Sequence, residues 1–125
     1  MATPNVFTTS SGPMVLHADF SPVTIARPAK AGEVLILMAT DLGPTRPGVD
    51  RGAAFPSQPS VEVNSPVEVT VDGKAVEVIN KIGWPAMTNV YRLDIKVPEG
   101  IAAGMSALQI TSAFISGSEV KIPLQ

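Results

Sequence analysis

The chain has 125 residues, of which 45% are apolar and 16% charged, and its net charge is −2 with nine scattered basic residues. One domain of this size buries enough surface for a core, whereas scattered basic residues argue against nucleic acid, which requires a clustered basic face. The chain has no cysteine, which excludes disulfides and thiolate zinc sites, and no apolar run approaches the ~20 residues of a membrane span.

Taken in order, the first segments predict short strands around a central one. Residues 6–7 predict an edge strand, and residues 14–20 predict a further strand. Residues 34–39 read Val-Leu-Ile-Leu-Met-Ala, and such an unbroken apolar run predicts a strand that is covered on both faces. The Asp-Leu-Gly-Pro sequence that follows at 41–44 predicts the turn that ends this strand.

The longest irregular segment is predicted at residues 43–65, which four prolines interrupt. A loop longer than ~15 residues is usually functional or disordered. We expect this one to be a proline-stiffened connection that crosses from one sheet to the other. A ligand-binding loop is the alternative.

The clearest local signal is a β-hairpin. Val67, Val69 and Val71 alternate with polar residues, and Asp72-Gly73 follows them directly. A type I′ turn needs positive φ at both central positions, which Asp-Gly provides. The sequence therefore predicts two strands, 67–71 and 75–79, joined by a two-residue turn.

Three later segments, residues 91–97, 108–111 and 120–124, alternate between apolar and polar residues with the period of a half-buried strand. Turns are predicted between them, including one at 114–117. Twelve prolines and ten glycines leave no room for long helices. The pattern predicts an all-β fold: an immunoglobulin-like β-sandwich of about seven short, mostly antiparallel strands, with residues 1–125 as a single domain.

Six segments in this order carry a resemblance to a known family. They are Asn-Val-Phe-Thr-Thr at 5–9, Pro-Ala-Lys-Ala-Gly-Glu-Val at 28–34, Ala-Thr-Asp-Leu-Gly-Pro-Thr at 39–45, Val-Thr-Val-Asp-Gly-Lys-Ala at 69–75, Tyr-Arg-Leu-Asp-Ile-Lys-Val-Pro at 91–98 and Gly-Ile-Ala-Ala-Gly at 100–104. The chain resembles the C-terminal immunoglobulin-like module of large secreted acidobacterial proteins, the Solibacter-type C-terminal domain. Asp41 stands where that family usually has glycine. A looser similarity links the chain to immunoglobulin-like modules of the plexin and transcription-factor type.

The resemblance covers nearly the whole chain and implies a context. It implies the C-terminal module of a longer exported protein, in an extracellular or cell-surface location, with neighbouring domains of the same polypeptide or other surface proteins as partners. The first residues lack the charged region and apolar core of a signal peptide, which fits either a cytoplasmic protein or a piece of a longer exported chain. The motifs are turns and strand ends, so they identify a scaffold and carry no function with them.

His17 is the only histidine, so any Ser-His-Asp site must use it. In a strand, Asp19 would share its face and could orient the imidazole or help to bind a metal weakly. Because neither a second histidine nor a cysteine is present, we expect His17 to be a surface or hydrogen-bonded structural residue, and we expect no transition-metal site.

Carboxylates are the other candidates for chemistry. Glu68, Asp72 and Glu77 could form an acid–base pair on the hairpin, but a solvated sheet face is the preferred interpretation. Asp41, Asp50 and Asp72 fall in predicted turns without the dense spacing of a calcium loop. No catalytic residue and no cofactor is therefore expected.

The few aromatic residues offer a candidate ligand site. Trp84, Tyr91 and Phe55 could stack on a sugar ring or anchor a peptide, although Trp84 in the core is the simpler expectation. We therefore expect a non-catalytic accessory module that acts as a spacer or protein-interaction domain. The alternative is a carbohydrate- or peptide-binding module that uses Trp84, Tyr91 and the 43–65 loop.

Overall fold

The computed structural model describes residues 4–9, 12–42, 45–46, 48, 54–56, 61–64, 66–100, 103–112 and 115–125. Every regular element among them is a β-strand, and all pairings between the named strands are antiparallel, which confirms the all-β prediction. The strands are β1 (Asn5–Val6), β2 (Thr8–Thr9), β3 (Gly12–Pro13), β4 (Val15–His17), β5 (Val34–Thr40), β6 (Thr45–Arg46), β7 (Glu62–Val63), β8 (Val67–Val71), β9 (Lys74–Gly83), β10 (Val90–Lys96), β11 (Gly104–Ser112), β12 (Ile115–Ser116) and β13 (Val120–Leu124).

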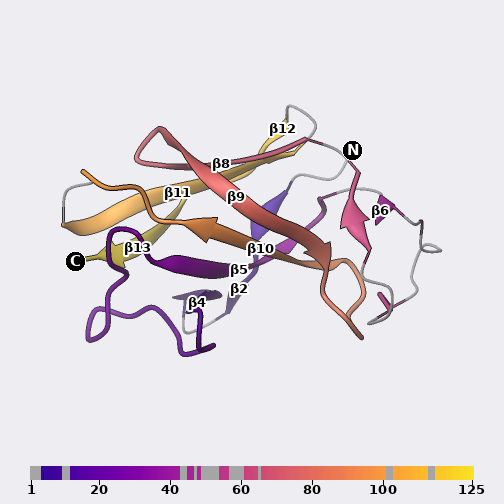
Figure 1. Cartoon of the computed structure of the whole chain (residues 1–125), viewed down its shortest axis with the longest axis horizontal. Helices are drawn as coiled ribbons and strands as arrows, with labels where there is room; N and C mark the ends of the chain where they lie inside the picture. Colours follow the sequence, from indigo (N-terminus) through magenta and orange to yellow (C-terminus); the bar gives the residue numbers. More distant parts are fainter. Residues whose placement is uncertain are drawn as a thin grey trace.

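Seven of these strands have three or more residues, in agreement with the predicted number. Apart from the small β2–β3 hairpin, the strands form one continuous sheet with the order β1-β5-β10-β9-β8-β11-β12, in which β4 also pairs with β5 and β13 with β11 (Figure 1). The sheet is curled, so that its β5–β10 half faces its β8–β11–β13 half.

The long strand β9 belongs to both halves. Its first residues pair with β8, and residues 77–83 pair with β10. The register with β10 shifts between Asp94 and Ile95, which leaves Ile79 without an opposite residue on β10. Such a bulge bends a strand and increases its twist, and this one lies three residues after Val76, the last residue of β9 that pairs with β8.

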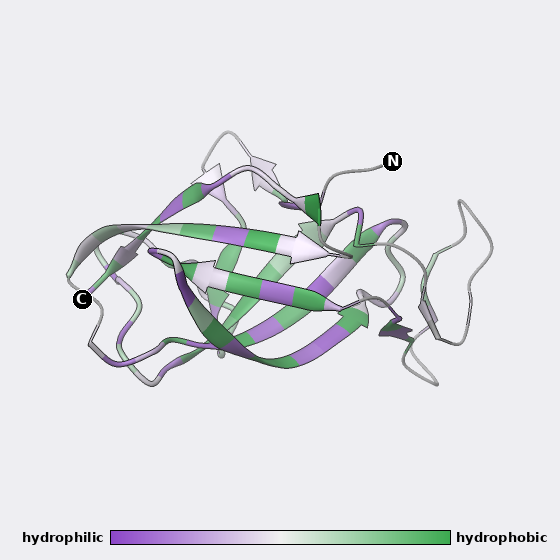
Figure 2. Ribbon diagram, turned by 90° about the horizontal axis from the view of Figure 1, so that it is seen from above, coloured by the Kyte–Doolittle hydropathy of each residue, from purple (hydrophilic) through white to green (hydrophobic). Residues whose placement is uncertain are grey.

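The core lies between the two halves, and period-two alternation explains which residues reach it. The strands in Figure 2 are banded with alternating apolar and polar residues. The apolar residues of these strands make up the buried core. The buried residues of the five principal core strands include Leu35, Leu37 and Ala39 of β5, Leu93 and Ile95 of β10, Val69 and Val71 of β8, Leu108 and Ile110 of β11, and Ile122 and Leu124 of β13.

The predicted central strand is β5. It pairs with β10 along its whole length and with β4 and β1 on its other side. Its outward face is also covered at Ile36, which is 2% exposed, whereas Val34 and Met38 are half-buried. Cover on both faces is therefore complete in the middle of the strand and partial at Val34 and Met38.

The predicted hairpin is confirmed with its turn type. Val71 pairs with Lys74, and the two residues between them, Asp72 and Gly73, have φ angles of 50° and 81°. Both values are positive, as a type I′ turn requires.

Three segments differ from the prediction. Within 14–20, the strand stops at His17. The following residues form a turn that reverses the chain, and Pro22 then makes an antiparallel bridge to Leu16 of β4. Within 43–65, the described residues include β6 and β7, which pair with each other. Residues 114–117, predicted as a turn, contain β12, which pairs with the end of β11.

Candidate functional site

The segment between β4 and β5 begins with a tight turn whose last residue is strained. The backbone N–H of Phe20 donates to the His17 carbonyl at 2.8 Å, and the N–H of His17 donates to the Ser21 carbonyl at 2.8 Å. Phe20 has a φ of 69°. This left-handed conformation normally belongs to glycine or asparagine in such a turn, and it is a marked outlier for a bulky residue.

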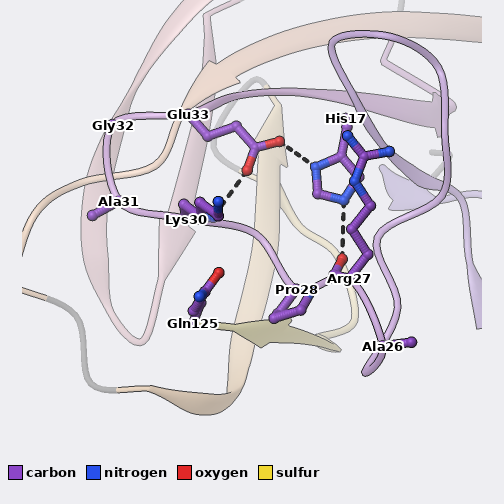
Figure 3. A pocket seen from close by; sticks show the side chains of 9 residues that line it. All are labelled: His17, Ala26, Arg27, Pro28, Lys30, Ala31, Gly32, Glu33 and Gln125. Carbon is purple, nitrogen blue, oxygen red and sulfur yellow. Dashed lines mark hydrogen bonds and ion pairs between the residues drawn. The ribbon is translucent and has the colours of Figure 1, made fainter.

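His17 ties this segment to the start of β5. Its side chain is buried, and both ring nitrogens have partners: Nδ1 contacts the Glu33 carboxylate, and Nε2 lies 3.0 Å from the Arg27 carbonyl oxygen. The second carboxylate oxygen of Glu33 accepts the Lys30 backbone N–H at 2.9 Å (Figure 3). Neither ring nitrogen is left to bind a substrate or a metal ion in this arrangement.

The possible pairing of His17 with Asp19 does not occur, because β4 ends between them. Asp19 instead accepts hydrogen bonds from the backbone N–H and the hydroxyl of Ser21, at 3.0 and 2.6 Å, and it forms an ion pair with Arg27 at 3.2 Å. The hydrogen bonds from Ser21, followed by Arg27, lower the pKa of Asp19 to about 2. Asp19 is therefore a turn residue, whereas Glu33 takes the place beside the imidazole.

A cleft of about 700 Å³ opens beside these residues. His17 and Glu33 lie on one side of it, and Arg27, Lys30 and Gln125 add further polar groups (Figure 3). Ala26, Pro28, Ala31 and Gly32 complete the lining. The lining therefore mixes polar side chains with small apolar residues, and it lacks the large apolar and aromatic side chains that line most small-molecule sites.

The structure brings together two of the three aromatic residues in the predicted ligand site, but it does so inside the core. The Phe55 and Tyr91 ring centroids lie 5.1 Å apart at an interplanar angle of 52°, and the residues are 7% and 5% exposed. Burial raises the pKa of Tyr91, and the nearby Asp41 carboxylate acts in the same direction. Trp84 is half-buried, so among these three residues it has the most exposed surface.

The carboxylates of the hairpin do not form an acid–base pair. The Asp72 carboxylate accepts the Ala107 backbone N–H at 2.8 Å. This bond, together with one from Ser106, lowers the pKa of Asp72. Glu68 and Glu77 are exposed, as a solvated sheet face predicts.

The two described calcium candidates, Asp41 and Asp72, have hydrogen-bond partners within the protein. Asp41 accepts a hydrogen bond from the Asn89 side chain at 2.7 Å, and Asp50 lies outside the described residues. Within the described part of the chain, no three His, Cys, Asp or Glu side chains come together in a way that could hold a metal ion.

Sequence reasoning missed the residues that line the cleft. Arg27 and Lys30 fall in a segment, 27–32, whose sequence predicts only a turn leading into the central strand, and Glu33 stands at the start of that strand. The early end of β4 was the missing information, because it reverses the chain and places residues 26–33 around His17.

The chain matches no protein-family model and no curated protein. Among the described residues, no helix has the length and apolar character needed to cross a membrane.

Proposed function

We propose that this protein is a non-catalytic accessory module of an exported or cell-surface protein, and that it acts as a compact spacer offering its loops to neighbouring domains or partners. The exported context comes from the family resemblance of the sequence. The module's mechanism is mechanical and adhesive rather than chemical.

The arrangement of His17 is the observation that carries the proposal. The only imidazole of the chain is 4% exposed, and its two nitrogens contact the Glu33 carboxylate and the Arg27 carbonyl. A general base must reach the proton that it abstracts, and this ring instead fastens one loop to the sheet.

An activity screen tests the proposal. The purified protein and its His17→Ala variant are assayed with chromogenic esters, glycosides and phosphate esters. We expect neither protein to exceed the buffer rate. Turnover by the wild type that disappears in His17→Ala would overturn the non-catalytic assignment.

A further inference from the structure

Both ring nitrogens of His17 face oxygen atoms that accept hydrogen bonds. Nδ1 contacts the Glu33 carboxylate, and Nε2 lies 3.0 Å from the backbone carbonyl oxygen of Arg27. A neutral imidazole has a single N–H, so its other nitrogen can only accept. Neither an ionised carboxylate nor a carbonyl oxygen can donate to that nitrogen. A neutral ring would therefore leave one of the two contacts without a hydrogen, whereas an imidazolium donates at both.

The surroundings of the ring do not supply the missing hydrogen. His17 is buried, and an unsatisfied polar atom in a buried position costs free energy. The other carboxylate oxygen of Glu33 already accepts the Lys30 backbone N–H at 2.9 Å. Glutamic acid and histidine have ordinary pKa values of about 4.3 and about 6.5, so a proton shared by the two side chains resides on the imidazole.

Two positive side chains also lie near the ring, and both are exposed to water. Arg27 and Lys30 line the cleft beside it. The Arg27 guanidinium is paired with the Asp19 carboxylate at 3.2 Å, and both side chains are more than half exposed. Lys30 is exposed as well. Because water and Asp19 screen these charges, their repulsion of a charged ring is weak.

The remaining elements around the ring bring one charge into direct contact with it. Leu35 of β5 lies opposite His17 and is apolar, and Gln125 lines the cleft from the end of β13 with an uncharged amide. The carboxylate of Glu33 is half-buried and touches Nδ1. A contacting negative charge favours the protonated form of an imidazole.

We propose that His17 is an imidazolium in the folded protein and that its two N–H groups form a proton-dependent latch. The latch joins the end of β4 to the Arg27 carbonyl and to Glu33, in the segment that leads into β5. Loss of a proton replaces one donor by a lone pair that faces an oxygen. Folding therefore favours the charged ring. The stability that the latch contributes is complete at low pH, where the histidine of the unfolded chain is also protonated, and is lost as the pH rises.

Glu33→Gln is the informative variant, because an amide can donate as well as accept. Its NH₂ group can donate to Nδ1 of His17 while its oxygen accepts the Lys30 N–H. A neutral ring that donates from Nε2 then satisfies every group, so the variant should fold without the second ring proton. Glu68→Gln is the matched control, since Glu68 is exposed on β8 and does not line the cleft.

The first measurement is the protonation state of the ring nitrogens by ¹⁵N NMR at about pH 7.5, where an ordinary histidine is mostly neutral. We expect both nitrogens to carry hydrogen in the wild type and in Glu68→Gln. In Glu33→Gln we expect hydrogen on Nε2 alone. A wild-type ring with one unprotonated nitrogen at this pH would overturn the charged state.

The second measurement is urea unfolding of the three proteins between pH 5 and pH 9. The folding equilibrium constant of the wild type, relative to that of Glu33→Gln, should fall by about tenfold as the pH rises. Glu68→Gln should follow the wild type. A ratio between wild type and Glu33→Gln that stays constant with pH would show that the ring proton does not hold the segment, and the latch would be refuted.

Discussion

The Phe55 ring packs directly against the backbone of Gly83, at the end of β9. A Cβ atom on Gly83 would lie 2.5 Å from Phe55 Cγ, closer than real Cβ atoms approach other groups. Phe55 comes from the proline-rich segment and is joined to the β9–β10 connection by two backbone hydrogen bonds, one from its N–H to the Met87 carbonyl and one from the Ala86 N–H to its own carbonyl. The absence of a side chain at Gly83 therefore allows the proline-rich segment to close one end of the core.

The first prediction concerns this contact. Gly83→Ala should destabilise the protein by about 1–3 kcal/mol, because the ring is buried and has to shift to admit the methyl group. Urea unfolding followed by intrinsic fluorescence measures the change. Gly48→Ala is the control, since the nearest atom to a Cβ there is 4.0 Å away, and its stability should match that of the wild type. Equal stability of Gly83→Ala and Gly48→Ala would contradict the packing of Phe55 on Gly83.

The second prediction concerns the type I′ turn. Gly73→Val should destabilise the hairpin, because a β-branched residue is strained at a φ of 81°. Thermal melts of the variant and the wild type measure the loss. Asp72→Asn should be tolerated better, since asparagine accepts positive φ and keeps an oxygen for the Ala107 N–H. A Gly73→Val protein with the same melting temperature as the wild type would refute the turn assignment.

The third prediction concerns the pH dependence of the same turn. Hydrogen bonds from Ala107 and Ser106 lower the pKa of Asp72 below its ordinary value of 3.8. A group whose pKa is lower in the folded state stabilises the protein above its unfolded pKa and loses that contribution as the pH falls. The stability advantage of the wild type over Asp72→Asn should therefore shrink as the pH decreases below about 4. Urea titrations from pH 6 to pH 2 measure it, and a gap that widens towards low pH would contradict the assigned bond.

The fourth prediction concerns His17 and Glu33. His17→Ala should cost about 1–3 kcal/mol, because it leaves the Arg27 carbonyl and the Glu33 carboxylate without the ring that joins them. Glu33→Gln should cost less, since its amide can still bond both the ring and the Lys30 N–H. Urea unfolding of the two variants measures the difference. The reverse order of stabilities would show that the imidazole is not the residue that holds the loop.

The fifth prediction concerns the middle of β5. Ile36→Asp should abolish cooperative folding, because it buries a charge on a strand whose neighbour Asp94 lies directly opposite. Circular dichroism and a thermal melt measure the outcome. A soluble variant with a sharp unfolding transition would show that this strand is not central to the fold.

Local patterns predicted the parts of the fold that depend on near neighbours. Alternation placed Leu93 and Ile95 in the core, and Asp72-Gly73 predicted both the hairpin and its turn type. These features require only the two-residue period of a strand and the φ preferences of two turn residues. The same local information could not show where β4 ends, because Ala18, Asp19 and Phe20 continue the alternation of apolar and polar residues beyond His17.

The sequence by itself determined an all-β chain with a buried central strand and a type I′ hairpin, since period and turn chemistry act over a few residues. Only the tertiary structure decided that His17 meets Glu33 across 16 positions, that Phe55 packs on Tyr91 inside the core, and that Phe20 stays exposed in a left-handed backbone conformation. These relationships depend on how distant segments pack against one another, and neither the two-residue period of a strand nor the φ preferences of a turn carry that information.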